Sequence, residues 1–159
     1  MADWDRPLTE AEAAWVERCR ETARVLYDGV EVPHHSCGIA MASTFGRATP
    51  AYQALRRGGL TGLGPCGVAL SGRMILGEIL GDPDPAGPVT GALRAAMMDY
   101  EARLPERLRR SSCNELVQDQ GEFGGPQRHA HCTRLASETA ALVAETLVRH
   151  GVPLPADAS

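Results

Sequence analysis

The sequence predicts an all-α fold, a compact single-domain bundle of about five to seven helices. Apolar residues recur at the three- and four-residue spacing of amphipathic helices along most of the chain. No stretch alternates like a half-buried strand between hairpin signals, and aromatic residues make up only 4% of the chain. A chain of 159 residues with 43% hydrophobic content can bury a conventional core. We therefore expect one helical domain over residues 1–159, with loose termini at 1–8 and 151–159.

Capping motifs and turn residues mark where the expected helices begin and end. Thr9 and Glu12 form a capping box before the first helix, which Gly29 ends. Ser112 and Glu115 form a second capping box before a short helical segment. In chain order, helices are expected over residues 10–27, 37–45, 50–57, 66–80, 89–104, a short segment from 113, and 129–150.

Three glycines stand five residues apart in the helix expected at 66–80. They are Gly67, Gly72 and Gly77. Each glycine weakens a helix by roughly 1 kcal/mol relative to alanine. We therefore expect these positions to pack closely against a neighbouring backbone.

The charged residues exclude several classes of function. The net charge is -4, so the chain offers no diffuse positive field for nucleic acid or an anionic membrane. All 16 basic residues are arginine, which excludes a Schiff-base lysine and a lysine phosphate loop. The N-terminus is acidic and polar where a secretion signal would be basic and then apolar, and no apolar run approaches a membrane span. We expect a cytoplasmic protein without a membrane span.

Four of the five cysteines share one kind of position. Cys37, Cys66, Cys113 and Cys132 each fall near the start of an expected helix, just after a loop. Unpaired N–H groups at a helix start stabilise thiolates, which bind soft metals and attack disulfides. Four such junctions can converge at one end of a bundle. Cys19 instead lies on the apolar stripe of the first helix, and we expect it in the core.

Four of the five histidines lie beside two of these cysteines. They are the candidate cofactor-binding residues His34, His35, His129 and His131. Imidazoles can ligate a metal, donate hydrogen bonds to thiolate sulfur, or carry protons. His129 and Cys132 are three residues apart and share a helix face, whereas His131 points elsewhere.

The cysteines stand in short motifs with a fixed order over roughly residues 20–150. These motifs are Ser36-Cys37-Gly38, Gly64-Pro65-Cys66-Gly67, Cys113-Asn114-Glu115-Leu116, and Cys132 opening a long helix. Their order resembles the redox-active proteins named for their C_GCAxxG_C_C pattern. The resemblance implies a helical protein of similar size with four characteristic cysteines, here the four above. The chain has one more residue between Cys66 and Gly72 than the family pattern, which turns the following helix by about 100°.

Three functions remain open from the sequence. In the first, the four cysteines are the catalytic and metal-binding residues of a redox protein, an oxidoreductase or electron carrier. They would hold an iron–sulfur cluster or another metal, and a redox protein or a small molecule would be the partner. The second is metal-free thiol–disulfide or sulfur-transfer chemistry, with Cys37 as the nucleophile. The third is a structural zinc module, although the cysteines are separated by 29, 47 and 19 positions rather than paired closely. A homo-oligomer is compatible with each.

Overall fold

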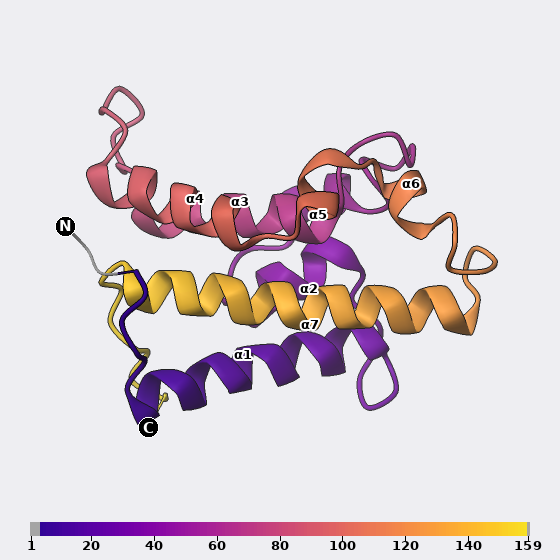
Figure 1. Ribbon diagram of the computed structural model, residues 1–159, viewed down its shortest axis with the longest axis horizontal. Coiled ribbons are helices and arrows are strands. Elements are labelled where there is room, and N and C mark those ends of the chain that lie inside the picture. The colour runs from indigo at the N-terminus through magenta and orange to yellow at the C-terminus, as the bar shows by residue number, and fades with distance from the viewer. Residues whose placement is uncertain (1–3, 159) are drawn as a thin grey trace.

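The computed structural model describes residues 4–158 and confirms the all-α prediction (Figure 1). Within these residues there are seven α-helices, one 3-10 helix and no strand. Their bounds are α1 (Glu10–Asp28), α2 (Cys37–Thr44), η1 (Pro50–Leu55), α3 (Gly67–Leu80), α4 (Gly91–Arg103), α5 (Glu106–Arg110), α6 (Cys113–Val117) and α7 (Pro126–Arg149).

Helix α7 is the centre of the bundle. It lies antiparallel to α1 along most of its length and also contacts α2, α3 and α4 (Figure 1). Cys19 of α1 is only 5% exposed and packs with Val16, Ala141 and Ala144 between the two long helices. This placement confirms that Cys19 is a core residue.

A buried tyrosine joins α4 to α3. The Tyr100 hydroxyl of α4 donates a hydrogen bond to the Ala69 carbonyl of α3, with 2.8 Å between the oxygens. A Cβ placed on Gly72 would stand 2.2 Å from that hydroxyl, and one on Gly67 would stand 2.1 Å from the Leu55 carbonyl oxygen. Close packing against a neighbouring backbone is therefore confirmed at Gly67, whereas Gly72 packs closely against the side chains of Tyr100 and Val143 instead. Gly77 has no neighbour within 4 Å of the same position, so the prediction is wrong there.

Both capping boxes are present. The Thr9 hydroxyl accepts from the Glu12 backbone N–H, and the Glu12 carboxylate accepts from the Thr9 N–H. Ser112 and Glu115 repeat this exchange at the start of α6. The second box fixes the position of Cys113, the first residue of α6. Ser36 stands at the N-cap position of α2, but its side chain makes no capping hydrogen bond.

Replacing Ser112 with alanine should lower the free energy of unfolding by about 1 kcal/mol, because the N–H of Glu115 loses its partner. Urea denaturation followed by circular dichroism measures this change. Ser111→Ala, which removes a neighbouring hydroxyl outside the cap, is the matched control and should change stability much less. Equal losses in the two variants would contradict a role for the cap.

The last helix begins three residues earlier than expected. Gly125 takes the N-cap position and Pro126 the first helical position, where a proline loses no hydrogen bond. Cys132 therefore lies in the second turn of α7, not at its N-terminus. The other three site cysteines lie at helix starts, as expected.

The described parts of both chain ends pack on the helices, although the sequence favoured loose segments there. Arg149 of α7 donates to the Trp4 carbonyl at 2.7 Å, and Arg18 of α1 donates to the Ala158 carbonyl at 2.5 Å. These long-range contacts carry no local signal in the sequence. The rest of both segments lies outside the described residues. No helix in residues 4–158 is both long and apolar enough to cross a membrane.

Candidate functional site

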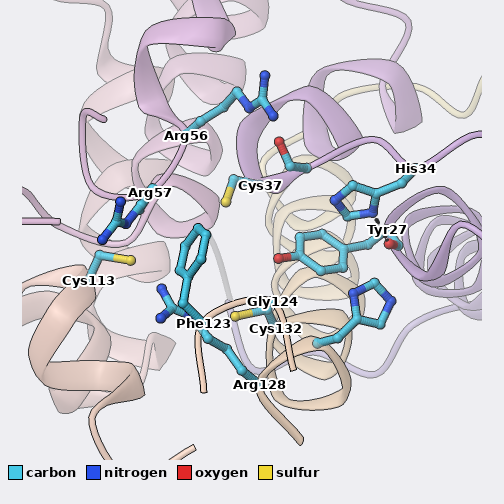
Figure 2. A pocket seen from close by; sticks show the side chains of 12 residues that line it. Tyr27, His34, Cys37, Arg56, Arg57, Cys113, Phe123, Gly124, Arg128 and Cys132 are labelled. Atoms are coloured by element: carbon cyan, nitrogen blue, oxygen red, sulfur yellow. Dashed lines mark hydrogen bonds between the residues drawn. The ribbon is translucent and has the colours of Figure 1, made fainter. Parts of the chain in front are cut away.

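Three of the four candidate cysteines line one cavity of about 240 Å³. Figure 2 shows the sulfur atoms of Cys37, Cys113 and Cys132 around this space, each from a different segment of the chain. Cys66 does not line this cavity and is 8% exposed. The pKa of Cys66 is raised to about 12, chiefly by burial; the backbone N–H groups of Ala69 and Val68 lower it, and the nearby Cys37 and Cys113 contribute a smaller increase. All four cysteines therefore belong to one neighbourhood, and all are free thiols.

Cys37 is held in an unusual backbone conformation. Its φ of 43° lies in the left-handed region, which residues other than glycine rarely adopt. Such a conformation costs free energy and persists only where the surroundings impose it, often at functional sites. The close approach of Gly67 adds to the constraint, because a Cβ there would lie 3.3 Å from the Cys37 Cβ. The start of α3, and with it Cys66, is thereby packed against the start of α2.

The glycine-rich loop after η1 brings Cys113 to the same place. The Cys113 N–H donates to the Gly64 carbonyl at 2.8 Å, and the Asn114 N–H donates to the Gly62 carbonyl at 2.9 Å. A Cβ on Gly58 would stand 2.7 Å from the Cys113 Cβ, so the loop can lie this close only without a side chain there. The loop is thus bonded directly to the start of α6.

A tyrosine contacts the fourth cysteine. The pKa of Cys132 is raised by burial, lowered by a hydrogen bond from the Tyr27 hydroxyl, and raised by the Cys37 and Cys113 thiols. The pKa of Tyr27 is itself raised, first by burial and then by Cys37 and Cys132. Tyr27 therefore stays protonated and available as a hydrogen-bond donor to sulfur.

Two of the four candidate histidines line the cavity. The His34 ring packs edge-on against Tyr27, with 4.8 Å between ring centroids, and its Nδ1 contacts the Tyr27 carbonyl (Figure 2). The Nε2 of His129 lies 2.9 Å from the Asp28 carbonyl oxygen. Since these carbonyls are acceptors, each histidine presents one N–H to the backbone and fixes its ring beside the cysteines.

His35 and His131 do not line this cavity. Each has a buried ring nitrogen without a hydrogen-bond partner, Nδ1 of His35 and Nε2 of His131. Burial lowers the pKa of His131, and the charges of Arg134 and Arg107, two residues that do not line the cavity, lower it further. The structure therefore brings His34 and His129 to the cysteines and leaves His35 and His131 apart.

Arginines are the charged residues that line the cavity. His34 and His129 are the other basic residues in its wall. Arg56, Arg57 and Arg128 contribute to its wall, and no aspartate or glutamate does so (Figure 2). Burial raises the pKa of Cys113, the Cys37 thiol raises it further, and Arg128 and Arg57 lower it. The cavity thus combines sulfur donors with fixed positive charge.

These side chains include several that the sequence did not single out, chiefly Tyr27, Arg57, Arg128 and Phe123. One signal was available for Arg128, because it precedes Cys132 by four residues and so shares its helix face. The others reach the cavity through contacts between distant segments, which no local pattern reveals.

The sulfurs surround the cavity instead of meeting at one point. Among residues 4–158 there is no group of three or more His, Cys, Asp or Glu side chains arranged to hold a single metal ion. A zinc ion needs its sulfur ligands about 2.3 Å away on all sides. The arrangement offers space between the thiols for a larger group, not a finished cage for one ion.

The thiol pKa shifts predict a pH dependence for the metal-free, reduced protein. A thiol with a raised pKa is protonated at neutral pH, so its thiolate fraction grows about tenfold per pH unit until the pKa is reached. Alkylation of Cys113 and Cys132 by iodoacetamide should therefore keep rising beyond about pH 9. Timed labelling with peptide mass spectrometry measures these rates. Rates that level off below about pH 8 would show that the surroundings lower these pKa values instead.

Fold and site together define a class, a small helical bundle with three thiols lining a cationic cavity and a fourth thiol close by. No protein-family model matches the chain, and no curated protein or solved structure gives a significant match. The resemblance to the C_GCAxxG_C_C proteins therefore stays a prediction carried by its motifs.

Proposed function

We propose that this chain is a small redox protein in which Cys37, Cys66, Cys113 and Cys132 hold an iron–sulfur cluster. The observation that supports this proposal is that thiols from three separate segments line one cavity, while a fourth thiol, that of Cys66, lies near two of them. Cysteine thiolates are the usual ligands of such clusters. The fifth cysteine, Cys19, is packed between α1 and α7 and is not part of the proposed site.

The donor set fits a cluster. Three sulfur donors and three arginines line the cavity, and no carboxylate of the described residues does so. Burial and mutual repulsion raise the pKa values of Cys66, Cys113 and Cys132, so the thiolates are unstable unless a cation lies among them. Metal binding supplies that positive charge and displaces the protons. A bound cluster would supply one-electron transfer.

The neighbouring side chains have roles that follow from their contacts. The Tyr27 hydroxyl donates to the Cys132 sulfur, and hydrogen bonds to ligand sulfur tune reduction potential. Arg57 and Arg128 lie near Cys113 and stabilise negative charge on its sulfur. These three residues favour the more reduced, more negative state of the centre.

The metal-free alternative has less support. An attacking cysteine needs a thiolate, and three of the four thiols are pushed toward the protonated form by burial. For metal-free thiol chemistry, Cys37 remains the best candidate nucleophile, since it lines the cavity together with His34. A structural zinc site has less support still, because the sulfurs do not converge on one point.

Purification without oxygen tests the proposal. The visible spectrum, iron, acid-labile sulfide, zinc and free thiols are measured on the same sample. A brown protein with matching iron and sulfide is expected. A colourless protein without iron or sulfide after reconstitution would overturn the proposal. Reversible thiol loss in such a sample would indicate exchange chemistry, and one reductant-insensitive zinc per chain would indicate a structural site.

A further inference from the structure

The three cavity arginines have no acidic partner within residues 4–158. Arg56, Arg57 and Arg128 form no ion pair with a carboxylate there, whereas Arg107 and Arg110 nearby each have one. Guanidinium groups gathered at one cavity repel each other unless an anion neutralises them.

An exposed phenylalanine occupies the place between two of these arginines. The Phe123 side chain is 68% exposed, and its ring lies 4.5 Å from the Arg57 guanidinium carbon and 4.8 Å from that of Arg128. Figure 2 shows the ring standing among the cysteine sulfurs at the cavity. A guanidinium over an exposed ring is held weakly, and a charge-assisted hydrogen bond to an oxyanion is stronger. An oxyanion that enters the cavity can therefore replace the Phe123 ring as the interaction partner of both guanidinium groups.

We propose that the cavity binds a small oxyanion between Arg57 and Arg128, next to Cys113. A guanidinium presents parallel N–H donors that match carboxylate, phosphate and sulfur oxyanions, so the shared chemistry is a compact group with two or more anionic oxygens. In the proposed redox function, this group is the substrate or the anionic part of it. The binding of the anion does not depend on the proposed redox function. Only the role of the anion as a reactant rests on that function.

Calorimetric titration of the reduced, metal-free protein tests the binding. Sulfate, phosphate and acetate are titrated separately at constant ionic strength, with chloride as the balancing anion, to distinguish tetrahedral from planar ligands. Saturable binding of at least one oxyanion is expected. Arg57→Gln and Arg128→Gln should each weaken it by about tenfold or more. The control is Arg109→Gln, which removes an exposed arginine that does not line the cavity and should leave the affinity unchanged.

A second readout localises the anion. A saturating oxyanion should slow alkylation of Cys113 in the unchanged protein and should have no such effect in Arg128→Gln. The proposal is overturned if no oxyanion binds saturably, if the site variants bind as well as the unchanged protein, or if Arg109→Gln loses as much affinity as they do.

The outcome is separable from that of the proposed function. Iron and sulfide are measured on reconstituted samples of the same variants. Oxyanion binding without any cluster would overturn the iron–sulfur proposal and leave the anion site intact. A cluster in a protein that binds no oxyanion would overturn the anion site alone. Loss of iron in Arg57→Gln and Arg128→Gln without any anion binding would mean that the arginines serve only to balance the thiolates.

Discussion

Replacing Cys66 with serine is expected to reduce the iron and sulfide content of reconstituted protein by about tenfold or more. Cys66 lies at the start of α3, where the Cys37 and Cys113 thiols affect its pKa. A serine hydroxyl has nearly the same size but is a hard and weakly acidic ligand that suits iron–sulfur chemistry poorly. The loss should therefore appear in the metal analysis and the visible spectrum, with the helical content unchanged.

Cys19→Ser is the matched control for this prediction. Cys19 and Cys66 are both buried, at 5% and 8% exposure, and burial raises the pKa of each to about 12. The two substitutions thus place a hydroxyl in similarly buried surroundings and should have similar costs in stability. Only Cys66 lies near the other thiols. Equal iron content in the two variants would remove Cys66 from the site.

The sequence predicted the helices well because their boundaries are encoded locally. The capping box at Thr9 and the glycine at the end of α1 are short-range signals, and both act as expected. The predicted start of α7 at His129 is three residues too late, although Gly125 and Pro126 form a recognisable start. The predicted start placed Cys132 in the first turn, where the helix N-terminus would stabilise its thiolate most strongly.

The composition of the site was only partly predictable. The positions of the cysteines at loop-to-helix junctions suggested that they gather in one place, and three of them line one cavity with Cys66 close to two of these. Which histidine faces the cysteines depends on the turn of the connector before α2, so His34 and His35 could not be told apart. Tyr27 and Arg57 reach the cavity only through tertiary packing. Periodicity reports which face of a helix is buried, not which distant residue it meets.

The second large effect is expected at Gly67. The Cβ of an alanine there would lie 2.1 Å from the Leu55 carbonyl oxygen, and that atom belongs to the backbone of η1 and cannot rotate away. Relief requires α3 to move from η1, so Gly67→Ala should lower the free energy of unfolding by about 3 kcal/mol. Gly77→Ala, in the same helix and with no neighbour within 4 Å, should instead raise it by about 0.5–1 kcal/mol. Urea denaturation of both variants measures the difference.

The same substitution connects the packing to the site. The Gly67 Cβ position is 3.3 Å from the Cys37 Cβ, so moving α3 away also separates Cys66 from Cys37. Gly67→Ala protein that remains folded at low temperature should therefore bind less iron, while Gly77→Ala should bind as much as the unchanged chain. If Gly67→Ala loses stability but keeps its full iron content, the centre does not depend on how closely α2 and α3 approach. In that case the glycine after Cys66 serves the fold alone, and its place in the cysteine motif has a structural reason instead of a chemical one.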